Sequence, residues 1–291
     1  MFRIDCHFHP NFSFLSKRKI KDKAKKIWTK FKEHKLDIVI CTEHNFKSPK
    51  EAYYDLLKFK PKNHKTTLLP GVEATTKEGI DILLFSNDPE FYEKEKDLLI
   101  PELYSLDNFI KRMKKAKNIF SVIAHPNIIL KQGLLSNQGS TKYFQKFRKF
   151  DFIEKHNACL NELVDSLQII KNTKFYKKIQ SVKNLPEKFI KNHNFLVGSD
   201  AHYIEDIGSF LEFPNINHKI DFNNLKKLIS SKEKRSVKFN ESKNKVISFS
   251  KKVLTSATEV LQSKIYNIKN NKNLTSLQWQ TEYTLKKNKS M

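Results

Sequence analysis

Asp5-Cys6-His7-Phe8-His9, at the start of the chain, decides how the rest of the sequence is interpreted. Ile4 leads into this stretch, which predicts a short first strand. Because side chains alternate along a strand, His7 and His9 are expected on one face. Two imidazoles side by side can bind a metal ion together with oxygen ligands. Taken alone, the pair fits two surface histidines equally well.

Five further apolar runs each end in histidine, carboxylate or other polar residues. They are 36–41 before Thr42-Glu43-His44, 67–69 before Pro70-Gly71-Val72-Glu73, 119–124 before His125-Pro126-Asn127, 150–153 before Glu154-Lys155-His156-Asn157, and 195–197 before Gly198-Ser199-Asp200-Ala201-His202. Each run is typical of a short buried strand. Since α/β barrels carry their chemistry at the carboxyl ends of their strands, the repeated pattern predicts one active site.

The order of these motifs resembles that of the PHP (polymerase and histidinol phosphatase) superfamily of metal-dependent phosphoesterases. The resemblance extends from Asp5 to about Gly208, and a similar pattern continues to about residue 240. It implies an α/β fold, a distorted (β/α)7 TIM-like barrel. It also implies two or three divalent metal ions (Mn, Zn, Fe or Mg) at the carboxyl ends of the strands.

The resemblance further implies a set of ligands. The first metal is expected on His7, His9, Glu73 and Asp200. Glu73 is expected to bridge to a second metal on His125, with Asp81 or Glu154 as a further ligand, while His44 and His202 are expected to hold a third. The implied catalytic residues are Glu73, Asp200, His202 and His44. Glu154 could instead support a neighbouring ligand without touching the metal.

Three positions depart from the family pattern. Many relatives carry an Asp or His where Ser13-Phe14-Leu15-Ser16 stands, Glu43 replaces a commoner Asp, and Asp81 replaces a His. Asp81 can still ligate Mn or Mg through oxygen. A weakened third site therefore follows, or two-metal chemistry in which His44 or His202 acts as a general acid.

The chain is strongly basic. It carries 55 Lys and Arg against 31 Asp and Glu, a net charge of +24, with a pI of about 9.7. A field of this sign attracts phosphate polymers, which favours a nucleotide or nucleic-acid partner. The alternative is a solvated, lysine-rich surface without such a partner.

The sequence predicts two regions, a PHP-like domain over 1–240 and a basic extension over 241–291. The extension holds ten Lys and six Asn against three Glu, and forms either a helix along 253–268 or a tail. No apolar run of membrane-spanning length and no leader are present, so a cytoplasmic protein without membrane contact is expected. Cys6, Cys41 and Cys159 have neither disulfide nor zinc-finger spacing.

Helices are expected at 20–31, 49–57, 105–116, 142–149, 159–170, 175–182, 186–191 and 222–229. Alternation of these helices with the strands favours a parallel barrel. The turn at Glu78-Gly79 is expected to return the chain as a strand over 80–85. Gln132 to Thr141 lacks the lysine of a P-loop and is expected to be a mobile loop that covers the site.

The function predicted from these features is a metal-dependent phosphoesterase, either an exonuclease or a nucleotide phosphatase. One alternative is a small-molecule phosphatase of histidinol-phosphate type. Another is a non-catalytic module that binds nucleic acid or a partner ATPase. Because the chain has no Walker motif, any ATPase activity would come from a separate polypeptide.

Overall fold

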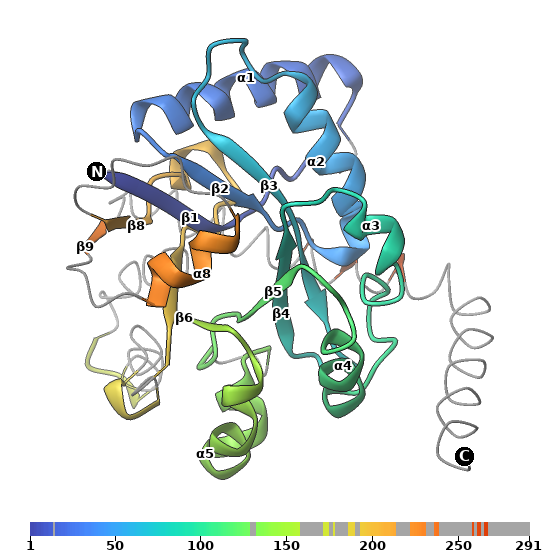
Figure 1. Ribbon diagram of the computed structural model, residues 1–291, viewed down its shortest axis with the longest axis vertical. Coiled ribbons are helices and arrows are strands. Elements are labelled where there is room, and N and C mark those ends of the chain that lie inside the picture. Colours follow the sequence, from blue (N-terminus) through green and yellow to red (C-terminus); the bar gives the residue numbers. More distant parts are fainter. Residues whose placement is uncertain are drawn as a thin grey trace.

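The computed structural model describes residues 1–13, 15–128, 132–157, 171–174, 177, 186–189, 193–213, 222–230, 236–238, 258, 261–262 and 265–266. The strands form one mixed sheet in the order β7-β6-β5-β4-β3-β2-β1-β8-β9 (Figure 1). Their bounds are Phe2–Phe8 (β1), Ile38–Cys41 (β2), Thr67–Thr75 (β3), Asp81–Ser86 (β4), Ile119–Ile123 (β5), Phe152–Asn157 (β6), Phe195–Gly198 (β7), Phe210–Phe213 (β8) and Ser236–Lys238 (β9).

The sheet curls until β1 and β7 meet. The backbone N–H of Asp200 donates to the carbonyl of His7 at 2.7 Å, and that of His9 donates to the carbonyl of Ala201 at 3.2 Å. A parallel bridge also joins Phe8 to Ala201. The strands from β1 to β7 thus form a nearly closed barrel, and β8 and β9 extend the sheet beyond β1. The predicted α/β barrel is confirmed.

The parallel arrangement is interrupted at β4, which runs antiparallel to both β3 and β5. A tight turn joins β3 to β4, with Gly79 at φ +79° and its N–H bonded to the carbonyl of Thr76. Such a turn is too short for the crossover that parallel strands require. The return predicted from Glu78-Gly79 is therefore present, and it places Asp81 opposite Thr75.

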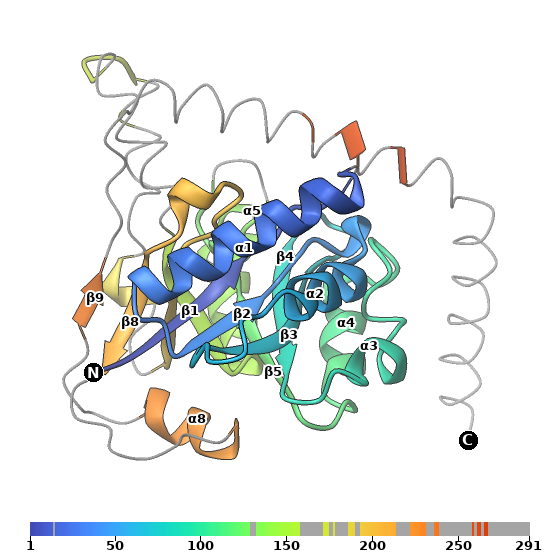
Figure 2. The same cartoon turned by 90° about the horizontal axis from the view of Figure 1, so that it is seen from above.

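The bounds of the helices are Lys17–Glu33 (α1), Pro49–Lys58 (α2), Phe91–Lys94 (α3), Leu106–Met113 (α4), Leu134–Lys146 (α5) and Phe222–Ser230 (α8). Helices α1, α2, α4 and α8 follow the predicted apolar stripes, whereas α3 and the start of α5 were not predicted. Short 3-10 helices span Asn45–Lys47 (η1), Phe147–Lys149 (η2), Glu187–Phe189 (η4) and Ile204–Asp206 (η5). In Figure 2, α1 and α2 lie on the opposite side of the strands from α8.

α1 illustrates how the sequence sets these positions. The hydroxyl of Ser16 caps its first turn by accepting from the N–H of Lys19. Its stripe of Ala24, Ile27, Trp28 and Phe31 is buried against the barrel. Because α1 follows the carboxyl end of β1, its basic N-terminal turns lie near the end of the barrel where the polar motifs gather.

Two apolar clusters lie on the two faces of the sheet. One packs the outer face against α1, α2 and α4. The other contains Leu69, Leu83 and Phe152, which lie on the same strand faces as Glu73, Asp81 and Glu154. This inner cluster also includes Leu225 and Ile229 of α8. One strand face therefore carries apolar residues toward one end and carboxylates toward the other.

The expectation of a mobile loop at Gln132 to Thr141 is wrong. α5 begins at Leu134 and passes through Gly139, which has a non-helical φ of +74°. Buried Leu134 and Tyr143 anchor it, and Leu135 N donates to the carbonyl of Pro126 at 2.7 Å. The two glycines suggested a loop, but Gly133 caps the helix and Gly139 marks a kink within it.

Several expectations fall outside the described residues. They include the helices at 159–170 and 175–182 and most of the extension 241–291, of which only 258, 261–262 and 265–266 are described, each in helical conformation. Within the part of the chain that the structure describes, no helix is long and apolar enough to cross a membrane.

Candidate metal centre

The structure brings all nine candidate ligands to one end of the barrel, although they are scattered over the chain. None is more than 9% exposed. The residues are His7, His9, His44, Glu73, Asp81, His125, Glu154, Asp200 and His202. Three groups of their side chains have ligand atoms close enough to share a metal ion: His7, His9 and Asp200; Glu73, Asp81 and His125; and His9, His44 and His202.

The first group forms where β1 meets the end of β7. The Nε2 atoms of His7 and His9 lie 3.0 Å apart. Asp200 Oδ1 lies 3.5 Å from His7 Nε2 and 3.2 Å from His9 Nε2. The pairing of β1 with β2 shifts register between Asp5 and Phe8, and such bulges often redirect side chains at functional sites.

Glu73 joins the three groups. Its Oε1 lies 3.0 Å from His125 Nε2 and 3.6 Å from His7 Nε2. Its Oε2 lies 2.9 Å from His44 Nδ1 and 3.4 Å from His9 Nε2. One carboxylate thus faces four imidazoles, which is the arrangement that a bridging ligand requires.

Asp81 completes the second group through the β3–β4 turn. Its Oδ2 lies 3.9 Å from His125 Nε2, and its Oδ1 accepts from the hydroxyl of Thr75 at 2.7 Å. Burial and the nearby charge of Glu73 both raise the pKa of Asp81. The same burial lowers the pKa of His125, but the hydrogen bond to Glu73 outweighs it and raises that pKa to about 9.

His9 also belongs to the third group, to which the sequence assigned only His44 and His202. His44 Nε2 lies 3.4 Å from His202 Nε2, and the ring of His9 stacks on both imidazoles, with centroids 4.5 and 4.3 Å away. Leu15, one of the positions at which the sequence departs from the PHP pattern, packs against the outer core.

Glu43 supports the third group from behind. Its carboxylate accepts from the N–H groups of Asn11 and His44 and lies 3.5 Å from His9 Nδ1. Despite burial, the neighbouring imidazole of His9 and the charge of Lys47 lower the pKa of Glu43 to about 2. Glu43 is therefore positioned to orient His9.

Glu154 contacts two candidate ligands with its two oxygens. Oε1 lies 3.0 Å from His7 Nδ1, and Oε2 accepts from the backbone N–H of His125 at 2.7 Å. A carboxylate on the far nitrogen of a ligating histidine fixes the orientation of its ring. This geometry favours the supporting role for Glu154 over direct ligation.

The electrostatics of the centre favour bound cations. Burial lowers the pKa of His7, but the charges of Asp200, Glu154 and Glu73 outweigh it and raise that pKa well above its usual value. Burial and the neighbouring His202 and His44 lower the pKa of His9. Imidazoles facing buried carboxylates supply nitrogen and oxygen donors suited to divalent metals. The Nδ1 atom of His125, on the other side of the ring from the nitrogen that faces Glu73, is buried without a hydrogen-bond partner among the described residues.

The backbone around the centre is unusual at three positions. His125 has φ +24° and Asp200 has φ +50°, values that non-glycine residues seldom adopt and that occur at functional sites. A Cβ on Gly198 would lie 2.3 Å from His7 Cβ and 2.7 Å from Glu154 Oε1. Only glycine lets β7 approach β1 this closely.

Three further residues lie beside the centre and received no role from the sequence. Asp5 is fully buried and accepts from the backbone and hydroxyl of Ser199. Lys23 donates to the carbonyl of Asn11 at 3.0 Å, and burial lowers its pKa to about 8. Lys47 is 5% exposed and donates to the side chain of Asn11. Proximity to the first and second motifs was the available signal for these residues.

Solved structures with a similar fold include two of endonuclease Q. The lesion-specific endonuclease PfuEndoQ from Pyrococcus furiosus is 18% identical, covers 81% of this chain and 57% of its own, and has a TM-score of 0.50. Endonuclease Q in complex with a 27-mer duplex substrate, which has an abasic lesion at the active site, is 18% identical. It covers 81% of this chain and 58% of its own, with a TM-score of 0.52.

PsfC from Pseudomonas syringae PB-5123 is a further similar structure. It is 17% identical and covers 91% of this chain and 100% of its own, with a TM-score of 0.51. No protein-family model matches the chain, and no curated protein matches its sequence. The chain spans less than two thirds of the endonuclease Q chains. At these identities the likeness establishes the fold.

Proposed function

We propose that this chain is a metal-dependent phosphoesterase of PHP type that hydrolyses phosphate esters in nucleotides or nucleic acid. The position of Glu73 is the observation that carries the proposal, since its carboxylate faces four imidazoles from three potential metal groups. The fold shared with endonuclease Q, which has been solved in complex with a 27-mer duplex substrate, supports a nucleic-acid or nucleotide ester.

Different residues of the chain would hold the different metal ions. His7, His9, Glu73, His125 and Asp200, with Asp81, would hold two divalent ions, and His9, His44 and His202 a third. Such ions neutralise phosphate oxygens and lower the pKa of water toward 7. The side chains of His44, Asp200 and His202 are 9–12% exposed, whereas those of His7 and His9 are fully buried. A substrate therefore reaches the centre past His44 and His202. In a two-metal centre, where no ion occupies the third group, either imidazole would instead donate a proton to the leaving group.

The basic face of α1 would attract a phosphate polymer to this end of the barrel. Its exposed residues are Lys17, Arg18, Lys19, Lys21, Lys25 and Lys26. Binding of single-stranded DNA or RNA should weaken steeply between low and physiological salt, because counterion release scales with the phosphates contacted. A flat salt response would favour the small-molecule phosphatase instead.

Metal content and hydrolysis together test the proposal. Elemental analysis of the purified protein should find two or more divalent ions per chain. The protein should cleave an aryl phosphate monoester or diester, or labelled single-stranded RNA or DNA, when Mn²⁺ is supplied. Asp200→Ala should abolish cleavage, whereas Asp88→Ala, which removes a carboxylate from the surface ion pair with Lys94, should retain it.

Absence of both metal and turnover after Mn²⁺ is supplied would refute the phosphoesterase. Nucleic-acid binding that survives His7→Ala would then favour the non-catalytic module. A separate ATPase partner and a cytoplasmic location stay predictions from the sequence.

A further inference from the structure

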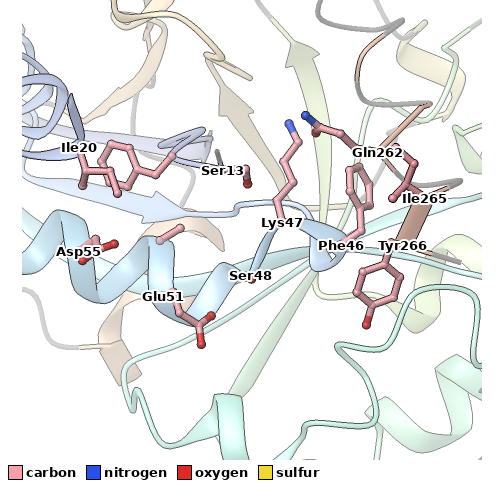
Figure 3. A pocket seen from close by; sticks show the side chains of 12 residues that line it. Ser13, Ile20, Phe46, Lys47, Ser48, Glu51, Asp55, Gln262, Ile265 and Tyr266 are labelled. Atoms are coloured by element: carbon pink, nitrogen blue, oxygen red, sulfur yellow. The ribbon is translucent and has the colours of Figure 1, made fainter. Parts of the chain in front are cut away.

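A cavity of about 340 Å³ lies between α1, α2, η1 and three residues of the C-terminal region. Figure 3 shows Phe46 and Lys47 of η1 beside Gln262, Ile265 and Tyr266, with Glu51 and Asp55 of α2 on the other side. None of these residues is a candidate ligand. The cavity is therefore separate from the metal centre.

The cavity nevertheless adjoins the accessible edge of the centre. The ring of Phe46, which lines the cavity, stacks on the imidazole of His44 with centroids 4.9 Å apart and planes 14° apart. Lys47, also in the lining, donates to Asn11, whose own N–H donates to Glu43 behind His9. A molecule in the cavity would thus lie next to a phosphate at His44 and His202.

The lining suits a flat aromatic group with polar edges. Phe12, Phe46 and Tyr266 supply ring surfaces, and Ile20 adds an aliphatic one. The side-chain carbonyl of Gln262 is buried and accepts no hydrogen bond from any described residue.

Charge is distributed unevenly along the cavity. Lys47 lies on the side of the metal centre, and the carboxylates of Glu51 and Asp55 line the α2 side. The lysine favours a phosphate near the centre, while the two carboxylates disfavour a second phosphate on the α2 side and can accept from amino groups. The volume is at the low end of the roughly 300–1,000 Å³ of ligand pockets, enough for one base but too small for a strand.

We propose that this cavity binds the nucleobase of the substrate whose phosphate lies at the metal centre. This inference rests on the proposed function and narrows it to esters of nucleosides or of single unstacked nucleotides. Base stacking on aromatic side chains is favourable for every base. Glu51 and Asp55, as acceptors, select bases that present N–H groups.

Equilibrium binding can test the base pocket without turnover. The probes are the phosphonate analogues of adenosine 5′-monophosphate and of ribose 5-phosphate, in which carbon replaces the ester oxygen. Calorimetric titration of the Mn²⁺-loaded full chain should give at least about tenfold tighter binding of the adenosine analogue. Tyr266→Ala and Gln262→Ala should reduce this ratio toward one and leave affinity for the ribose analogue unchanged.

Tyr54→Ala provides the matched control, because Tyr54 lies on α2 with 44% of its surface exposed and does not line the cavity. This variant should keep the wild-type ratio. Equal affinities of the wild type for the two analogues, failure to bind either, or a ratio that neither cavity variant changes would each overturn the base pocket. Ester cleavage without a base preference would leave the proposed function standing, whereas a base preference without cleavage would leave only the pocket.

Discussion

Asp5 offers a quantitative test of the electrostatics around the centre. The side chain is 0% exposed. Its Oδ1 accepts from the N–H groups of Ser199 at 2.9 Å and His7 at 3.2 Å, and its Oδ2 accepts from the hydroxyl of Ser199 at 2.6 Å. Burial raises the pKa of Asp5 from 3.8 to about 7, despite these bonds. The folded protein therefore keeps the carboxyl of Asp5 protonated at pH values below about 7.

Asp5→Asn removes the ionisation and keeps the shape. The amide oxygen can accept from both N–H groups, and the new NH₂ can donate to the hydroxyl of Ser199. That hydroxyl can then donate to the carbonyl of His7, which lies 3.1 Å away. The substitution thus leaves the local hydrogen bonds complete and isolates the effect of charge.

The direction of the pH dependence of stability follows from the raised pKa of Asp5. Below pH 3.8 the carboxyl is protonated in both states and contributes no pH dependence. Between 3.8 and 7 only the unfolded chain loses the proton, so the free energy of unfolding falls as pH rises. At about 1.4 kcal/mol per pH unit, the fall is about 4 kcal/mol in all and about 3 kcal/mol between pH 5 and pH 7.

Urea unfolding of the chelator-treated protein at several pH values measures this effect. The difference in the free energy of unfolding, Asp5→Asn minus wild type, should rise by about 3 kcal/mol from pH 5 to pH 7. Asp37→Asn is the control, because Asp37 is only half-buried and burial also raises its pKa. The pH-dependent gain in stability of Asp37→Asn over the wild type should be smaller than that of Asp5→Asn. A difference between Asp5→Asn and wild type that is independent of pH would refute the reasoning.

Three further substitutions separate geometry from charge. Gly198→Ala should lower metal content and thermal stability together, because the new Cβ would displace His7 and Glu154. The control is Gly71→Ala, whose Cβ would lie 2.9 Å from a β4 carbonyl; it should lower thermal stability and retain the metal. Glu154→Gln should weaken metal binding about 10- to 100-fold in chelator competition, and unchanged affinity would exclude its supporting role. Asp200→Asn should bind less metal yet unfold at higher urea than Asp200→Ala, since Asn tolerates a positive φ; equal midpoints would contradict this.

The carboxyl ends of the barrel strands could be predicted from the sequence, because each coincides with the change from apolar to polar residues. Apolar runs such as 38–41 must be buried, and the first polar group after each run lies at the edge of the sheet. His44, His125 and Asp200 all follow such runs, and the structure places them together at the same end of the barrel. A shared edge is a consequence of parallel strands, which is why residues far apart in sequence could be grouped.

Side-chain partners could not be predicted in the same way. Glu154 was a candidate ligand because it ends a strand, but its oxygens contact His7 and the backbone of His125. Lys23 belongs to a helix face that is otherwise exposed, yet it reaches Asn11. Such contacts depend on distances of a few ångströms between separate elements, which spacing along one chain does not specify.

The β3–β4 turn decides where Asp81 lies in the barrel. Because β4 runs antiparallel, Asp81 begins a strand, whereas Glu73 lies near the end of β3. Reversal of the chain brings both carboxylates to the same end of the barrel, where each lies within 4 Å of His125. A carboxylate is shorter than an imidazole, and the hydroxyl of Thr75, directly opposite in the pairing, holds it in place. The turn thus places a carboxylate oxygen beside His125, and oxygen donors are the ligands that harder ions such as Mn²⁺ or Mg²⁺ favour.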